Sequence, residues 1–366
     1  MSPGRQVRAD GFAGAVVSWQ RRHGRHHLPW QGTRDPYRVW LAEIMLQQTQ
    51  VATVLGYYER FLARFPDVAA LAAASPDEVL ASWSGLGYYS RARHLHRCAQ
   101  AVVAQHGGSF PRDSATLATL PGIGRSTAAA IAAFCGGERS AILDGNVKRV
   151  LTRAFGFGHD LAEAKHERAL WALAESLLPR RDMPAYTQGL MDLGAQVCAR
   201  RRPACDACPL AGRCVARAQG RPEAYPVKTR RLRRGERRSA LLWLEQDERL
   251  WLVHRPSLGV WAGLWSLPEF DDDAALRSLC APWPGAGEAL PPIKHVLTHL
   301  DWWLAPLRWR LPRRLPAATR RAIEAALPAG CWMTRADALA SGLPAPIRRW
   351  LERSTPAESL TPAAGS

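Results

Sequence analysis

Four cysteines near the middle of the chain are spaced so that they could bind one metal centre. Cys198, Cys205, Cys208 and Cys214 follow the pattern C-x6-C-x2-C-x5-C. Thiolates are preferred ligands of zinc and of iron–sulfur clusters. A structural zinc usually has two close pairs of ligands, and this segment has one, Cys205 with Cys208. The spacing therefore favours a [4Fe–4S] cluster, with a zinc site or a metal-free loop as the alternatives.

Two carboxylates with contrasting neighbours could carry out acid–base chemistry. Glu43 lies in the apolar stretch 39–46, where burial would raise its pKa and keep it protonated as a general acid. Asp144 is placed to cap a helix, where amides keep a carboxylate ionised. One neutral and one charged acid is the combination that cleavage of a glycosidic bond needs. The alternatives are a polar helix face with Gln47 and Gln50, which could itself line an active-site cleft, and a purely structural cap.

A glycine hairpin between these two acids is suited to binding phosphate. The segment 120–124, Leu-Pro-Gly-Ile-Gly, precedes an Ala-rich helix over 128–134. Gly122 and Gly124 allow a tight turn, and the first amides of the helix then point at an anion, here a DNA phosphate. The pattern is typical of a helix-hairpin-helix, and an ordinary tight turn between helices is the alternative.

Helices must position these residues. From residue 11 to 218 apolar side chains recur at spacings of three and four, and Pro and Gly divide the stretch into short helices. No β-rich run interrupts it. The segment 226–238 is basic and contains Pro and Gly, which predicts a linker between domains. We therefore expect a mainly α-helical domain over 11–225.

The chain changes character after this linker. Ten of the fifteen tryptophans lie from Trp243 onward. Apolar runs on both sides of the polar turn at 246–248 predict a β-hairpin. We expect a smaller α/β domain over 239–353 and a disordered tail over 354–366. The predicted strands are 240–244, 250–253, 295–304 and 307–311, and the predicted helices are 317–326 and 346–352.

The chain is strongly basic, with a formal net charge of +17 over 366 residues and a pI near 10.3. A field of that sign favours a polyanion, and nucleic acid is the usual one. The excess is nearly all arginine, which could alternatively reflect a GC-rich genome. The sequence lacks the roughly 18 consecutive apolar residues of a membrane span. The polar first ten residues argue against a secretory signal, so we expect a cytoplasmic protein.

Taken together, these motifs resemble the adenine DNA glycosylases of the MutY type, which belong to the helix-hairpin-helix superfamily that also contains endonuclease III. The resemblance implies base excision repair of adenine mispaired with 8-oxoguanine or guanine. The adenine would be extruded into a pocket between two helical subdomains, where its N-glycosidic bond is hydrolysed. The matching segments are 28–30, 43–51, 85–91, 120–127, 143–147 and the four cysteines.

The resemblance also implies roles for single residues. Glu43 would protonate the adenine ring, and Asp144 would stabilise the resulting oxocarbenium-like cation. Asn146 and Ser126 would position the acids or the water. The residues similar to those of the adenine pocket are Arg25, Trp30 and Gln188. The residues that correspond to elements beside the oxidised guanine are Gln48, Thr49, Leu86 and Tyr88. The alternatives are core positions for Trp30 and Leu86 and a solvated helix position for Gln48.

The number of lysines separates a simple glycosylase from a lyase. A lyase of the endonuclease III kind needs a lysine to form a Schiff base. Up to Val227 the chain contains only Lys148 and Lys165. Ser126 occupies the hairpin position where such a lyase has its lysine. We therefore predict a monofunctional enzyme that leaves an abasic site.

The C-terminal domain resembles the Nudix-like recognition domain of the same family. Residues 259–268 match its signature loop and strand, but the clustered glutamates of true Nudix hydrolases are absent after Pro268. This domain should therefore bind rather than hydrolyse. Residues 295–299 align with the family's Phe-Ser-His loop, with Leu297 in place of the Phe and Thr298 in place of the Ser. Thr298 and His299 are thus candidates for sensing guanine, with core strand positions as the alternative.

Two other functions compete with this prediction. An endonuclease III-like pyrimidine glycosylase is disfavoured by the second domain and by Ser126. A non-catalytic iron–sulfur protein that binds DNA is disfavoured by the pairing of Glu43 with Asp144. The partner we expect is double-stranded DNA, bound by a monomer at the nucleoid, with no membrane contact.

Overall fold

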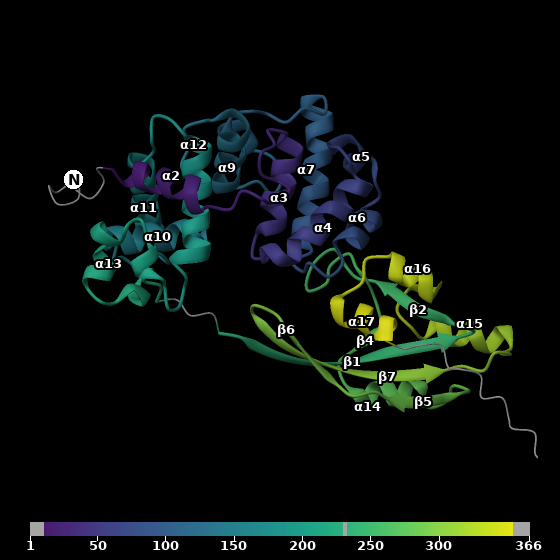
Figure 1. The fold of residues 1–366 in the computed structure, drawn as a ribbon. Helices are drawn as coiled ribbons and strands as arrows, with labels where there is room; N and C mark the ends of the chain where they lie inside the picture. The colour runs from purple at the N-terminus through teal and green to yellow at the C-terminus, as the bar shows by residue number, and fades with distance from the viewer. Residues whose placement is uncertain (1–10, 230–232, 354–366) are drawn as a thin grey trace, which may run out of the picture. The chain divides into compact units, whose positions relative to one another are not determined.

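The computed structural model describes residues 11–229 and 233–353, which divide into two compact units (Figure 1). Among these residues the first unit contains 11–73 and 94–229, and the second contains 74–93 and 233–353. The tail predicted to be disordered, 354–366, lies outside the described residues.

The first unit is helical throughout its described part, as the apolar spacing predicts. Sequence signals explain several helix starts. Asp35 caps one helix by accepting a hydrogen bond from the Tyr37 amide at 2.9 Å, and Pro36 fills its first position. The helices are α2 (Phe12–His23), α3 (Pro36–Leu46), α4 (Val51–Arg64), α5 (Val68–Ala73), α7 (Ser90–His106), α8 (Ser114–Leu117), α9 (Arg125–Gly136), α10 (Gly145–Phe155), α11 (Ala164–Ser176), α12 (Met183–Asp192), the π-helix Leu193–Val197 and α13 (Val215–Ala218).

Small residues bring two of these helices close together. The alanines of α9 from 128 to 130 and at 132 and 133 are all buried. Because an alanine face has no long side chains, α3 packs closely against α9. A second core joins α2, α10, α11 and α12 around Phe12, Leu151 and Leu190. These contacts hold the segments that carry both predicted acids.

The second unit is built on one sheet. Its long parallel pair, β1 (Gly235–Gln246) and β7 (Leu300–Arg310), stays in register along its whole length. The predicted hairpin is confirmed, because β1 pairs antiparallel with β2 (Arg249–His254) across a turn at Asp247 and Glu248. The other elements are α6 (Pro76–Trp83), β3 (Trp265–Ser266), β4 (Glu269–Phe270), α14 (Asp273–Cys280), β5 (Ala286–Ala289), β6 (Ile293–Val296), α15 (Ala317–Ala325), β8 (Gly330–Thr334), α16 (Arg335–Ala340) and α17 (Ala345–Arg353).

Two details of this sheet differ from the sequence prediction. Strand β1 begins at Gly235, inside the segment that was expected to be a linker, because its first residues pair with β7. The predicted strand 295–304 is interrupted at 297–299, where the chain turns from β6 into β7. The Leu297 amide closes that turn with a 2.8 Å hydrogen bond to the Leu300 carbonyl. Thr298 and His299 are therefore exposed turn residues and not core strand residues.

Residues 74–93 pack with the C-terminal part of the chain, although their sequence reads as part of the helical region. The Leu343 carbonyl accepts hydrogen bonds from the hydroxyls of Ser84 at 2.9 Å and Tyr89 at 3.0 Å. Arg348 of α17 donates to the Ser84 hydroxyl at 2.9 Å. In the part of the chain that the structure describes, no helix combines the length and the apolar character needed to cross a membrane.

Candidate active site

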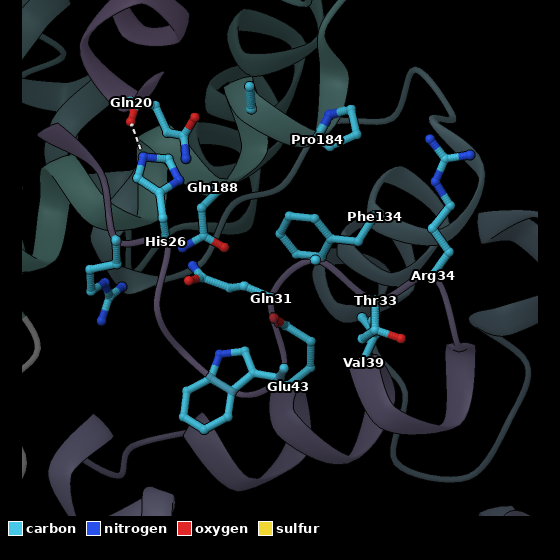
Figure 2. Close-up of a pocket in the computed structure, with 14 residues that line it drawn as sticks. Gln20, His26, Gln31, Thr33, Arg34, Val39, Glu43, Phe134, Pro184 and Gln188 are labelled. Carbon is cyan, nitrogen blue, oxygen red and sulfur yellow. Dashed lines mark hydrogen bonds between the residues drawn. The ribbon is translucent and has the colours of Figure 1, made fainter. Parts of the chain in front are cut away.

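A pocket of about 490 Å³ opens in the first unit (Figure 2). The end of α2, the loop 25–34, α3, α9 and α12 all contribute to its wall. It brings together four of the residues singled out from the sequence: Glu43, Arg25, Trp30 and Gln188. Trp30 is also 8% exposed and packs edge-on against Tyr58 at 5.3 Å, so it is a core residue and a wall residue at once.

Glu43 presents its carboxyl to this pocket from the middle of α3 (Figure 2). The neighbours Ala42 and Ile44 are buried, and Glu43 itself is half-buried. Burial, and then the charge of Asp144, raise the pKa of Glu43 to about 8. The carboxyl is therefore mostly protonated at neutral pH, as its apolar surroundings predict.

Asp144 caps α10 as predicted, and its carboxylate accepts a hydrogen bond from the Val147 amide at 2.7 Å. Burial nevertheless raises the pKa of Asp144, an effect that its position at the start of a helix does not predict. The amides of Val147 and Asn146 and the charge of Arg149 oppose this shift. Glu43 has no comparable groups that lower its pKa. Asp144 thus has groups beside it that favour its charged form, and its charge in turn raises the pKa of Glu43.

Ser126 and Asn146 act on the backbone around Asp144. The Ser126 hydroxyl accepts a hydrogen bond from the Leu143 amide at 3.0 Å, which fixes the residue that precedes Asp144. Asn146 accepts from the Arg149 side chain at 2.8 Å and packs against Gly194 of the π-helix. A Cβ at Gly194 would come within 2.6 Å of the Asn146 Cβ, so this close approach requires glycine.

The glycine hairpin has the conformation that the sequence suggests. Gly122 has a φ of +78°, and a Cβ there would lie 2.6 Å from the Cβ of His94. The buried Ile123 anchors the turn. Gly124 starts α9 without a side-chain cap, so the first amides of that helix stay available. The geometry suits a phosphate, with Gly122 needed for both its φ and its lack of a side chain.

The four cysteines line a second pocket together with Arg153. Burial, together with the charges of the other three thiols, raises the pKa of Cys208 to about 11, so the four groups are neighbours. Among the described residues, no three His, Cys, Asp or Glu side chains are grouped to hold a single metal ion. Four thiols around one space are donors that either an iron–sulfur cluster or a zinc ion can take.

Two arginines of α10 connect this cysteine loop to the helix that Asp144 caps. Arg149 donates to the carbonyls of Gly194 at 2.5 Å and Cys198 at 2.7 Å. Arg153 is 2% exposed and donates to the Ala199 carbonyl at 2.7 Å and to the Cys198 sulfur at 3.4 Å. These hydrogen bonds connect the cysteine loop directly to α10.

A buried carboxylate orients two polar residues of the first pocket. Asp192 is 0% exposed, and it accepts hydrogen bonds from the Arg25 amide at 2.9 Å and the Arg25 side chain at 2.6 Å. It also accepts from the Gln188 side-chain nitrogen at 2.9 Å. Because a carboxylate accepts and does not donate, the Gln188 amide must turn its nitrogen toward Asp192. Its oxygen remains available as an acceptor.

Gln31 is a pocket residue that sequence reasoning missed. Its side-chain oxygen accepts a hydrogen bond from the Leu28 amide at 3.2 Å. Its side-chain nitrogen is therefore the atom left to donate to a ligand. That nitrogen is buried and has no hydrogen-bond partner among the described residues. Figure 2 shows the amides of Gln31 and Gln188 and the carboxyl of Glu43 around the same space. Only its place beside Trp30 in the sequence could have suggested it.

The residues predicted to lie beside guanine are found in both units. Gln48 is exposed with a φ of +57° and stands next to Thr49 at the end of α3, in the first unit. Leu86 and Tyr88 lie in the second unit. Leu86 is 6% exposed and so is largely a packed residue, whereas Tyr88 is 44% exposed.

Thr298 and His299 also lie in the second unit. The hydroxyls of Tyr88 and Thr298 share a hydrogen bond at 2.9 Å. The structure thus joins two candidates that are far apart in the sequence. The side chain of His299 is exposed, and its carbonyl accepts from the Gly235 amide at 3.0 Å.

Two family models match the chain. The HhH-GPD superfamily base excision DNA repair protein matches residues 41–176, and the NUDIX domain matches residues 239–353. The adenine DNA glycosylase of Buchnera aphidicola subsp. Acyrthosiphon pisum is 38% identical over 259 residues, which are 71% of this chain and 74% of the relative. The chain belongs to the adenine DNA glycosylase family. It is therefore a DNA glycosylase of base excision repair, a hydrolase of N-glycosyl bonds.

Other adenine DNA glycosylases are similar to this chain over comparable lengths. The human protein is 36% identical over 311 residues, 70% of this chain and 57% of its own length. The Mycolicibacterium smegmatis protein is 41% identical over 209 residues, 57% of this chain and 70% of its own. This membership excludes a non-catalytic DNA-binding protein, and it does not favour a pyrimidine glycosylase.

Solved structures agree on the architecture of this adenine DNA glycosylase. A thermostable thymine-DNA glycosylase has a TM-score of 0.53 at 29% identity, over 58% of this chain and 98% of that chain. A non-covalent endonuclease III–DNA complex has a TM-score of 0.51 at 21% identity, over 60% of this chain and 99% of that chain. The prediction of a helical helix-hairpin-helix core followed by a smaller Nudix-like domain is confirmed.

Proposed function

We propose that this enzyme excises adenine mispaired with 8-oxoguanine, or with guanine, from duplex DNA and leaves an abasic site. The observation that supports this most strongly is that Glu43 lines the pocket and interacts with the charge of Asp144. Burial and the charge of Asp144 raise the pKa of Glu43 to about 8, while amides and Arg149 favour the charged form of Asp144. One protonated and one charged carboxyl group is the combination that suits cleavage of an N-glycosidic bond.

The two acids act in sequence on a flipped adenosine. Glu43 donates its proton to ring nitrogen 7 of the adenine, which makes the base a better leaving group. The bond between the sugar and the base then breaks, and its electron pair leaves with the adenine. Asp144 stabilises the sugar cation, by its charge or as a transient adduct, until a water oxygen adds to it. Ser126 fixes the backbone before Asp144 through the Leu143 amide, and Asn146 is itself held by Arg149.

The pocket amides provide a reason for the choice of adenine. Gln188 is oriented by Asp192 to present an oxygen, and Gln31 is oriented by Leu28 to present a nitrogen. Adenine offers a matching amino group and ring nitrogen 1, whereas guanine offers a carbonyl and an N–H at these positions. Adenine would also satisfy the unpartnered nitrogen of Gln31. Arg25 supports Gln188 through Asp192, and Trp30 provides a flat wall.

The cysteine loop would hold a [4Fe–4S] cluster through Cys198, Cys205, Cys208 and Cys214. When bound, such a cluster supplies metal–thiolate cross-links and a redox-active centre. In this chain Arg153 balances thiolate charge and ties the loop to α10. The hairpin at Gly122 and Gly124 would bind a phosphate of the DNA backbone.

We propose that each unit has its own residues for contact with the guanine of the mispair or with the DNA beside it. The Nudix-like domain binds DNA without hydrolysing a nucleotide. The residues that would contact the guanine or its neighbours are Gln48, Thr49, Leu86, Tyr88, Thr298 and His299. The enzyme would work as a monomer on the DNA of the nucleoid in the cytoplasm.

We further propose that the enzyme is monofunctional. Lys148 pairs with Glu167 at 2.5 Å, and Lys165 pairs with Glu163 at 2.9 Å. Each amine is thus bound to a carboxylate, and neither lysine lies among the residues that line the pocket. After adenine release, the DNA strand should break only when alkali is added, and borohydride should trap no enzyme on it.

The test is adenine release by Glu43→Gln under single-turnover conditions. The substrates are duplexes with adenine opposite 8-oxoguanine and opposite guanine, with alkali added to reveal abasic sites. Removal of the acid should slow release by at least about a thousandfold. The matched control is Glu175→Gln, at a half-exposed carboxylate of the same unit. Release by Glu43→Gln near the wild-type rate would contradict the assignment.

A further inference from the structure

Three loops of the second unit lie in a ring of contacts. The first loop, 84–89, follows α6, the second, 256–263, follows β2, and the third, 297–299, joins β6 to β7. The first and third loops meet at the hydrogen bond between Tyr88 and Thr298, 2.9 Å long. We call the third loop the recognition loop, because it contains Thr298, which is a candidate for contacting guanine.

The second loop contacts the elements that adjoin the other two loops, α7 after the first loop and β6 before the third. Arg93, in the first turn of α7, donates to the Ala262 carbonyl at 2.7 Å. The ring of Trp261 lies against that of His295, with 5.4 Å between centroids. His295 belongs to β6 and leads into the recognition loop. Adjacent residues of the second loop, 261 and 262, therefore contact the two segments that carry Tyr88 and Thr298.

Trp261 has a backbone conformation that bulky residues rarely adopt. Its φ is +61°, in the left-handed region where the Cβ of an L-residue is crowded. A glycine would take this conformation without strain. The indole is nevertheless only 6% exposed and lies 4.5 Å from the Trp302 ring. Contacts of the indole thus hold a backbone that the residue itself disfavours, and such strain is concentrated at functional sites.

The geometry points to Trp261 as a positioning residue for mispair recognition. It supports His295 on one side of the recognition loop, and Tyr88 holds Thr298 on the other. Without the indole, His295 loses its aromatic contact and the recognition loop becomes less ordered. The hydroxyl of Thr298 is then no longer held in one position relative to the guanine. This inference rests on the proposed role of Thr298 in sensing guanine.

The first test compares two tryptophan variants of the full-length protein. Trp261→Ala removes the indole that contacts His295 beside the recognition loop. Trp309→Ala is the matched control, because Trp309 packs in the same domain against Trp283, at 6.5 Å, outside the three loops. Trp261→Phe keeps an aromatic ring at the position. Each protein is assayed for adenine release opposite 8-oxoguanine and opposite guanine in single turnovers.

We expect Trp261→Ala to lower the ratio of the two rates by about tenfold, the effect of losing one or two fixed hydrogen bonds. The rate opposite plain guanine should stay within about threefold of wild type. Trp261→Phe should restore most of the ratio, and Trp309→Ala should leave it unchanged. An unchanged ratio in folded Trp261→Ala, or an equal fall of both rates in both alanine variants, overturns the inference.

A second readout needs no DNA. The Leu297 amide donates to the Leu300 carbonyl at 2.8 Å, so its hydrogen exchange reports the order of the recognition loop. In Trp261→Ala this amide should exchange at least about tenfold faster, with β1 unchanged. Unchanged exchange at Leu297 overturns the positioning role. If wild type shows no preference for 8-oxoguanine, the proposed guanine reading by Thr298 fails, and the exchange result alone then decides whether Trp261 positions the loop.

Discussion

Glu43 and Asp144 come from distant parts of the chain, and the charge of Asp144 helps burial to raise the pKa of Glu43 to about 8. The relationship follows from the packing of α3 against α9, whose residue Ser126 holds the backbone in front of Asp144. It has consequences for pH, stability and rate that can each be measured.

The first prediction concerns pH. As a general acid, Glu43 must be protonated, so single-turnover adenine release should fall as the pH rises through about 8. A rate that is flat between pH 6 and roughly 9, with DNA binding unchanged, would argue that Glu43 is not the acid.

The second prediction is that Glu43→Gln stabilises the fold. A folded-state pKa of about 8, above the ordinary 4.5, means that the unfolded chain releases this proton more easily. The stability contributed by Glu43 is therefore complete below pH 4.5 and is lost as the pH rises toward 8. The variant removes this loss, on the order of a few kcal/mol at pH 8. Denaturant unfolding at pH 5 and at pH 8 checks this. An equal effect at both values would contradict it.

The third prediction concerns Ser126. Ser126→Ala leaves the Leu143 amide without its acceptor and loosens the residue before Asp144. A lost buried hydrogen bond of about 1–2 kcal/mol should slow base release about five- to thirtyfold while DNA affinity changes little. Ser18→Ala, at an exposed position of the same unit, is the control. A fall in affinity with an unchanged rate would assign Ser126 to DNA binding instead.

The fourth prediction separates activity from stability at Gln31. Gln31→Leu removes a buried, unpartnered nitrogen but also the acceptor of the Leu28 amide, so the stability of the free protein should change by no more than about 1 kcal/mol. Adenine release should nevertheless slow by about tenfold, because the donor for the base is gone. Gln31→Glu replaces that donor by an acceptor and should slow release further. Wild-type rates in both variants would exclude Gln31 from base recognition.

The fifth prediction concerns Gly194. A side chain there would push against Asn146, so Gly194→Ala should displace the start of α10 and slow base release by about tenfold or more. Gly14→Ala in α2 is the matched control, because a Cβ there meets no atom within 4 Å. The control should keep its rate and gain roughly 0.5–1 kcal/mol of stability. Equal rates in both variants would contradict the contact.

The cysteine loop can be tested by its cofactor. The purified protein should be yellow-brown, and removal of its iron by a chelator should unfold the loop and lower the melting temperature. A colourless protein that contains zinc would contradict the cluster assignment.

Much of this molecule follows from local sequence pattern. Apolar spacing and breaking residues define the helices, and the Asp144 cap and the glycine hairpin are visible in a few consecutive residues. The apolar neighbours of Glu43 predict its raised pKa, and the spacing of the cysteines favours a cluster over zinc. These features depend on nearest neighbours along the chain, which a sequence displays directly.

Other features depend on atoms that are distant in sequence. The pKa of Asp144 rises because other segments bury it, although its own helix stabilises its charge. Residues 74–93 pack with the C-terminal part through Leu343 and Arg348, and Tyr88 meets Thr298 for the same reason. The orientation of the Gln31 amide depends on one backbone N–H. Desolvation and hydrogen-bond direction are properties of a three-dimensional environment, so only the tertiary structure could decide them.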